Sequence, residues 1–131
     1  MRALAGCYRL TVGSWQRAPA GGPTMTSQQP PARFRLDTVV LPPPFDHRFA
    51  VQPAKVAGGN WPAGRSVAGD SVDLWWSTGF TGVRLRLAAR GDTLVGRAET
   101  HHDSHVVGEP PDPEAPVRAV RTRCAGGRPR A

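Results

Sequence analysis

Residues 70–99 read DSVDLWWSTGFTGVRLRLAARGDTLVGRAE and show the side-chain alternation of an antiparallel β-meander. Apolar side chains occupy every second position in three runs, at 72–76, 83–87 and 94–98, as expected for strands with one buried face. The segments STGF and ARGD separate these runs and supply the glycine that a tight turn favours. Gly96 and Ala98 fall on the inward face of the third strand, where small side chains relieve crowding in a curved sheet.

Similar alternation predicts further strands on both sides of this meander. In the first of them, Tyr8, Leu10 and Val12 share one face. The additional strands are expected at 7–15, 33–41, 47–52 and 116–124. They are separated by segments rich in Gly, Pro and polar residues, which predict loops at 16–32, 56–69 and 108–116.

These patterns predict seven to eight strands, no helix and no internal repeat. An antiparallel meander leaves unpaired edges, and small proteins remove them by closing the sheet into a barrel. We therefore expect an all-β, antiparallel up-and-down β-barrel over residues 1–124, with a β-sandwich as the alternative. Residues 125–131 (AGGRPRA) are expected to form a disordered basic tail.

The chain is strongly basic, with a net charge of +7 over 131 residues. All but one of its basic residues are arginines, and most of them are scattered along the chain rather than grouped in one stripe. A specific nucleic-acid site would need such a stripe. The composition therefore argues against nucleic acid as the partner and favours general attraction to anionic surfaces.

Cys7 and Cys124 lie near opposite ends of the chain and are the only cysteines. Such a pair can join the first strand to the last through a disulfide, which requires an oxidising compartment. The alternative is two buried thiols in a cytosolic protein. LAGC, at residues 4–7, also matches the bacterial lipobox, and lipidation of Cys7 would exclude the disulfide. Three residues precede LAGC, so no signal peptide is visible, although we expect an extracytoplasmic location; no segment is long and apolar enough to span a membrane.

The segment HHDSH contains the most reactive group of side chains in the sequence. In an extended strand, alternate side chains project to the same side, so His101, Asp103 and His105 could bind a divalent metal such as zinc. The alternative is a polar strand end that continues into a solvated loop.

Aromatic side chains could line a pocket for an apolar ligand. We assign ligand contacts to Trp15, Trp61, Trp76, Phe80 and Leu85, and ordinary core packing is the alternative for most of them. On the opposite face of the same strands, Arg84 and Arg86 could bind an anion. Alternatively, they are solvated and paired with carboxylates such as Asp73 or Glu99 on neighbouring strands.

The segments GCYRLTVGSW and GDTLVGRAE, with Gly13 and Trp15 at the end of the first strand, resemble the lipocalin-like barrel proteins of bacterial envelopes. The resemblance lies in this Gly-x-Trp element and in the succession of strands. It implies a barrel with a hydrophobic ligand cavity and no catalysis. Gly13 and Trp15 lie near the end of the first strand rather than near its start, so no binding residues are carried over from the family.

The sequence therefore favours a non-catalytic barrel that binds a small apolar or amphipathic ligand and is exported. One alternative is a structural or protein-interaction domain with a packed interior and no ligand. A third is a metal-dependent enzyme that uses the His101, Asp103 and His105 cluster. Motifs for phosphate binding, metalloprotease chemistry or a serine nucleophile are absent, so no cofactor is expected and catalysis has no support.

Overall fold

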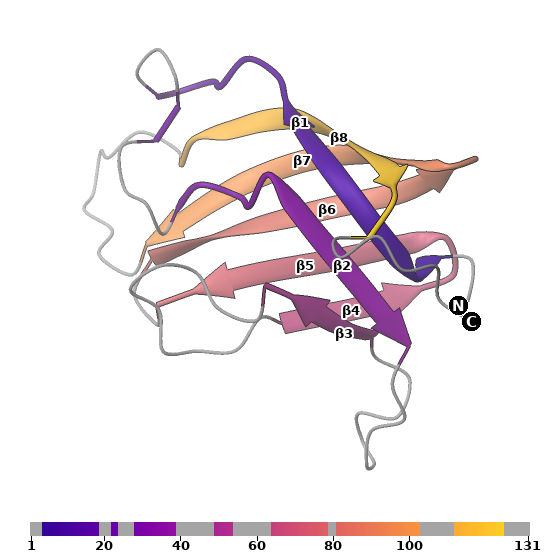
Figure 1. Cartoon of the computed structure of the whole chain (residues 1–131). Helices are drawn as coiled ribbons and strands as arrows, with labels where there is room; N and C mark the ends of the chain where they lie inside the picture. Colours follow the sequence, from indigo (N-terminus) through magenta and orange to yellow (C-terminus); the bar gives the residue numbers. More distant parts are fainter. Residues whose placement is uncertain are drawn as a thin grey trace.

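The structure is a computed structural model that describes residues 4–18, 22–23, 28–38, 49–53, 64–78, 81–102 and 112–124. These residues form eight β-strands and no α-helix (Figure 1). The strands are β1 (Gly6–Val12), β2 (Arg33–Thr38), β3 (Phe49–Gln52), β4 (Gly64–Ala68), β5 (Ser71–Ser77), β6 (Thr81–Arg90), β7 (Thr93–His102) and β8 (Glu114–Thr122). The predicted all-β architecture is confirmed.

The strands form one antiparallel sheet with the order β3-β2-β1-β8-β7-β6-β5-β4. Strands that follow one another in sequence are therefore neighbours everywhere except at β3 and β4. The first and last strands pair over a register that runs from Cys7 opposite Thr122 to Val12 opposite Val117. β3 and β4 stand at the two ends of the hydrogen-bonded order and lie close together, which makes the sheet a nearly closed up-and-down barrel.

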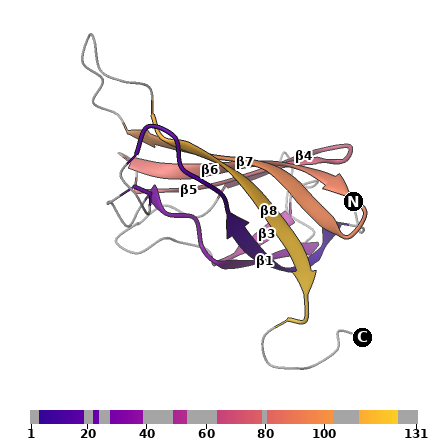
Figure 2. The ribbon, with the colours of Figure 1, turned by 90° about the horizontal axis from the view of Figure 1, so that it is seen from above.

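The apolar core lies between two sides of this barrel. Seen from above, β1, β2 and β3 face β4, β5, β6 and β7, and β8 connects the two groups (Figure 2). Inward side chains align in rows across the paired strands, as the period of the meander predicts. One fully buried row crosses four strands and consists of Leu74, Leu85, Ala98 and Ala115.

Gly96 marks a position where two strands approach too closely for a side chain. A Cβ atom added to it would overlap the backbone carbonyl of Arg86 on β6. Ala98, two residues further along β7, is fully buried. The expectation that small inward residues accommodate the curvature of this strand is consistent with both observations.

Two of the predicted loops contain strand residues. β4 lies within the predicted loop 56–69, where the segment GRSVA has too few apolar residues to show alternation; it becomes a strand by pairing with β5 across the turn at Gly69. β8 begins at Glu114, inside the predicted loop 108–116, and contains Pro116. The Pro116 carbonyl accepts a hydrogen bond from the N–H of Gly13, just beyond the end of β1. In an antiparallel strand the N–H and C=O of one residue point toward the same neighbouring strand, so the N–H that Pro116 lacks would also face the end of the β1–β8 ladder.

The predicted tail, 125–131, lies outside the described residues, as do parts of the predicted loops. Within the part of the chain that the structure describes, no helix combines the length and the apolar character needed to cross a bilayer.

Candidate functional site

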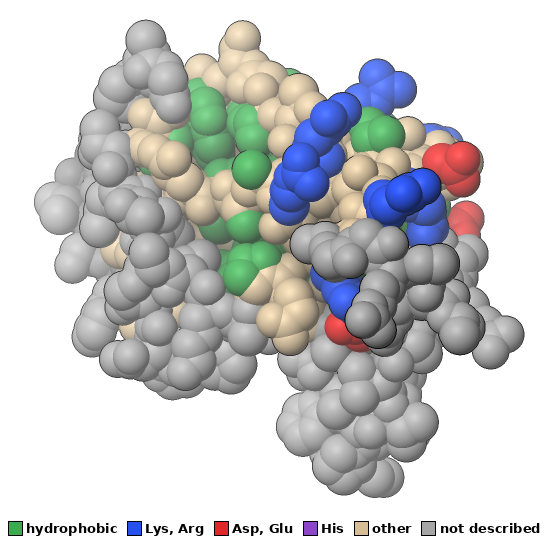
Figure 3. All heavy atoms as spheres, viewed as in Figure 1, with side chains coloured by type: hydrophobic (Ala, Val, Ile, Leu, Met, Phe, Trp, Pro, Cys, Tyr) green, Lys and Arg blue, Asp and Glu red, His purple; other side chains and the backbone are tan. Residues whose placement is uncertain are grey.

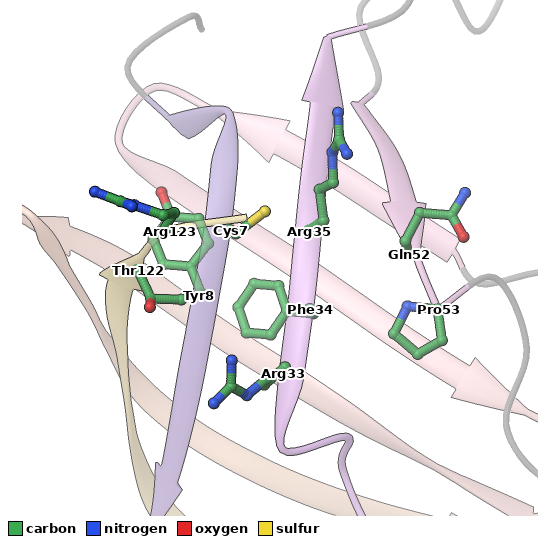
Figure 4. Close-up of a pocket in the computed structure, with 9 residues that line it drawn as sticks. All are labelled: Cys7, Tyr8, Arg33, Phe34, Arg35, Gln52, Pro53, Thr122 and Arg123. Atoms are coloured by element: carbon green, nitrogen blue, oxygen red, sulfur yellow. The ribbon is translucent and has the colours of Figure 1, made fainter. Parts of the chain in front are cut away.

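A pocket of about 270 Å³ lies beside the Cys7–Cys124 disulfide, where β8, β1, β2 and β3 adjoin (Figure 4). Part of its lining is one outward row of cross-strand neighbours, formed by Thr122, Cys7, Arg35 and Gln52. The remaining lining residues are Tyr8, Arg33, Phe34, Pro53 and Arg123. The volume is just below the range for small-molecule sites, about 300 to 1,000 Å³.

The aromatic residues of the pocket are held in place by the core. The rings of Tyr8 and Phe34 are stacked with their centroids 5.2 Å apart, and the ring centroids of Phe34 and Trp76 are 6.5 Å apart. The indole N–H of Trp76 donates a hydrogen bond of 2.8 Å to the carbonyl of Pro53, another lining residue. A chain of three aromatic rings therefore connects the buried centre of the barrel to the pocket, and its lining is preorganised.

The arginines give the pocket a positive charge, and their surroundings differ. Arg35 forms an ion pair with Asp37, with an Nε to Oδ1 distance of 2.6 Å. Arg33 is exposed, and no carboxylate pairs with it among the residues described. In Figure 4 its guanidinium extends from β2 toward β1. Arg123 is also exposed without a carboxylate partner among the described residues, but in Figure 4 its guanidinium points away from Phe34, so Arg33 is the cationic group best placed to bind an anionic ligand.

Tyr8 stands where the pocket meets the core, and its hydroxyl donates a hydrogen bond of 2.9 Å to the carbonyl of Leu4. Burial raises the pKa of Tyr8 above its ordinary value of 10.0; the positive charge of Arg121 acts to lower it and the negative charge of Asp92 to raise it. The Arg121 guanidinium also lies over the Tyr8 ring, 5.2 Å from its centroid. The folded protein therefore favours the neutral phenol.

Tyr8 is the only tyrosine in the chain, so its ionisation can be followed directly. We expect the ultraviolet absorbance of tyrosinate to appear at a higher pH in the folded protein than in the denatured protein. Because the folded pKa is the higher one, the associated stability is complete below pH 10.0 and is lost as the pH rises through the folded value. Tyr8→Phe should remove this alkaline dependence and cost about 1 kcal/mol for the lost hydrogen bond. Equal titration of folded and denatured protein would contradict the assignment.

The predicted disulfide between Cys7 and Cys124 is present, with a Cα–Cα distance of 5.1 Å. It joins β1 to the residues that follow β8, so it reinforces the pairing of the first and last strands. In this structure Cys7 lines the pocket and is not a free thiol. The disulfide, rather than a lipidated Cys7, is the arrangement that the structure shows.

The residues predicted to contact a ligand lie in different environments. Trp76 and Leu85 are fully buried in the core, and Trp76 acts on the pocket through its hydrogen bond to Pro53. Trp15 follows β1 and packs, half-buried, against the edge of the core. Trp61 and Phe80 lie outside the described residues. None of the three described residues lines the pocket beside the disulfide.

The predicted metal cluster is only partly described. His101 lies on β7, whereas Asp103 and His105 fall outside the described residues. Within the described ranges, no group of three or more His, Cys, Asp or Glu side chains is arranged to hold a metal ion. The neighbouring His102 pairs with Asp112, with an Nδ1 to Oδ1 distance of 2.9 Å.

A second hollow, of about 250 Å³, lies on the outer side of the barrel and is lined by Trp75, Arg84 and His101. Arg84 lies over the Trp75 ring and forms an ion pair with Asp73. Its cationic charge is therefore balanced by Asp73, although its buried Nε has no hydrogen-bond partner among the described residues.

Arg84 and Arg86 on β6 are paired with carboxylates, as one of the two sequence interpretations predicted. Arg84 binds Asp73, and Arg86 Nε lies 3.1 Å from Glu99 Oε1. Further along the same outer surface, Glu114 binds both Arg97 and Arg17. Desolvation acts to raise the pKa of Glu114, but the hydrogen bonds and charges of these two arginines hold it below its ordinary value.

Sequence reasoning did not identify the pocket residues Arg33, Arg35, Gln52 and Pro53 as a group. The segment RFRL did show arginines outward and apolar side chains inward on β2. The missing information was the register, which places β2 beside Cys7 after an intervening loop. The signal present in the sequence is the alternation that places Arg33 and Arg35 outward on either side of the inward Phe34.

Comparison of the chain with protein-family models, curated proteins and solved structures found no match.

Proposed function

We propose that this chain is a non-catalytic binding protein of lipocalin-like design that holds a small amphipathic molecule with an acidic head group. The observation that carries this proposal is the pocket beside the disulfide, in which Arg33, without a carboxylate partner among the described residues, adjoins aromatic side chains and Pro53.

The chemistry of the lining supports an amphipathic ligand. Tyr8, Phe34 and Pro53 provide apolar contact, and a guanidinium recognises a carboxylate or phosphate through paired N–H donors. The volume of about 270 Å³ suits a small molecule, or the head and upper chain of a longer one. A ligand that is only apolar would leave Arg33 unused.

The location proposed for the protein is outside the cytoplasm. Disulfides persist in oxidising compartments, and this one joins the two terminal strands. A carrier of acidic amphiphiles in an envelope or secreted fluid is consistent with this chemistry.

Isothermal calorimetry with decanoate below its micellar concentration tests the proposal. We expect saturable binding at one site, and substantially weaker binding of decanol, which has the same chain without the charge. Arg33→Gln should weaken decanoate binding roughly tenfold, because it removes a charge-assisted hydrogen bond. The matched control is Arg86→Gln, which removes the same charge from an arginine already paired with Glu99 on the other side of the barrel.

Equal weakening by Arg33→Gln and Arg86→Gln would show a response to net charge alone and would contradict the proposed site. Absence of binding by oxidised, folded protein to both decanoate and decanol would favour the alternative of an interaction domain with a packed interior.

A further inference from the structure

The outward arginines of the barrel differ in whether a carboxylate pairs with them. Over β5 to β8, Arg84, Arg86 and Arg97 each bind a carboxylate on a neighbouring strand, and Arg90 at the end of β6 is exposed without an ion pair among the described residues. Over β8, β1 and β2, the outward arginines form a second group that we call the basic face. Its members are Arg9, Arg33, Arg35, Arg118 and Arg123.

Few acidic side chains pair with the arginines of the basic face. Asp37 pairs with Arg35, and no other ion pair reaches a member of the face among the described residues. Arg9, Arg33, Arg118 and Arg123 are all exposed. Figure 3 views the barrel from this side, with β1 and β2 in front, and shows Lys and Arg side chains on it in excess of acidic ones.

Arg9 on β1 and Arg33 on β2 are directly opposite each other in the ladder. Arg86 and Arg97 are opposite each other as well, but each of these binds a carboxylate, whereas Arg9 and Arg33 have no carboxylate partner among the described residues. Like charges in directly opposite positions destabilise an antiparallel pair. An anion between the two guanidinium groups would remove this repulsion, so the pair is a favourable place for a phosphate group.

We infer that the basic face docks this protein onto a bilayer that contains anionic phospholipids. The inference rests on the extracytoplasmic location proposed above. An exported protein meets membranes, and a membrane that contains anionic phospholipids is an extended anionic surface. The face is spread over three strands rather than concentrated in a stripe, which matches a two-dimensional array of phosphate groups. Docking would turn the pocket toward the membrane, from which an acidic amphiphile could enter it.

Sedimentation with lipid vesicles tests this inference. We expect the oxidised protein to bind vesicles of phosphatidylcholine mixed with phosphatidylglycerol, to bind vesicles of phosphatidylcholine alone far less, and to dissociate as salt is added. The double variant Arg9→Gln/Arg118→Gln should weaken binding to the anionic vesicles roughly 20-fold, since each arginine near such a surface contributes about fivefold. Arg118 neither lines the pocket nor lies opposite Arg33, so Arg118→Gln alone should weaken vesicle binding about fivefold and leave decanoate binding unchanged.

The matched control is Arg86→Gln/Arg97→Gln, which removes the same net charge from paired arginines outside the basic face. Its vesicle binding should stay within about twofold of the wild type. Thermal melting of both double variants shows whether each is folded.

Three results would overturn the inference: no binding to anionic vesicles, equal weakening by both double variants, or tighter Arg9-dependent binding to duplex DNA than to vesicles. The vesicle experiment and the decanoate experiment test independent claims. If the wild type does not bind decanoate, the proposed pocket ligand is contradicted, and the vesicle result still tests membrane docking.

Discussion

Reduction of the Cys7–Cys124 disulfide should lower the melting temperature of this protein by roughly 10–20 °C. The two cysteines are 117 residues apart in sequence, so the bond closes a loop that includes nearly the whole chain. In the chain-entropy description, a loop of this length restricts the unfolded state by about 5 kcal/mol, and disulfides typically stabilise proteins by about 2–4 kcal/mol. For a domain of this size, each kcal/mol corresponds to roughly 4 °C.

Differential scanning calorimetry with and without reductant measures this effect. The double variant Cys7→Ser/Cys124→Ser should melt near the temperature of the reduced wild type and should not respond to reductant. A wild type whose melting temperature changes by less than about 3 °C on complete reduction would contradict a stabilising role for the bond.

Gly96→Ala should destabilise the barrel by about 3 kcal/mol or more, although it adds a single methyl group. The new Cβ would overlap the backbone carbonyl of Arg86, and a backbone in the middle of a sheet cannot move aside as a flexible side chain can. Either β6 and β7 separate locally, or the curvature of the sheet changes. Chemical denaturation followed by tryptophan fluorescence measures the free energy of unfolding.

Gly91→Ala is the matched control for this substitution. Gly91 lies in the turn between β6 and β7, has a φ of 63°, and has no atom within 4 Å of the position of an added Cβ. Its alanine variant should lose about 1 kcal/mol through the left-handed backbone conformation alone. Equal losses in the two variants would show that close approach of the strands at Gly96 is not what excludes a side chain.

Alternation was sufficient to predict the meander at β5, β6 and β7, because each of these strands has one buried face and one solvated face. Val72, Leu74 and Trp76 are buried as the two-residue period requires. The same rule missed β4, whose sequence carries a single strongly apolar residue and which becomes a strand through its partner. It also placed the start of β8 at Pro116 rather than at Glu114, because Glu114 and Ala115 continue a proline-rich, acidic segment that is typical of a loop.

The candidate site was less predictable, because it depends on register between strands separated by long loops. The pairing of Cys7 with Cys124 could be expected from their places at the two ends of the chain. The proximity of Arg33 to Cys7 could not, since it follows from the pairing of β1 with β2. Trp76 was expected to contact the ligand, whereas it is buried and holds Pro53 through a hydrogen bond.

Some apolar residues of the barrel only pack in its core, whereas others also line the pocket and can contact a ligand. Leu74, Leu85 and Ala98 are fully buried and belong to one row of inward neighbours. Tyr8 and Phe34 also belong to the buried core, but they line the pocket as well. A ligand at this pocket needs no opening of the barrel, which distinguishes the proposed site from one in the barrel interior.

Amide chemical-shift mapping distinguishes these two locations directly. Isotope-labelled, oxidised protein would be titrated with decanoate and the shifted amides assigned. We expect saturable shifts at Cys7, Arg33, Phe34, Arg35 and Thr122, with little change along the buried row. Saturable shifts centred on Leu74, Leu85 and Ala98, or no saturable shift at any amide, would contradict a ligand site beside the disulfide.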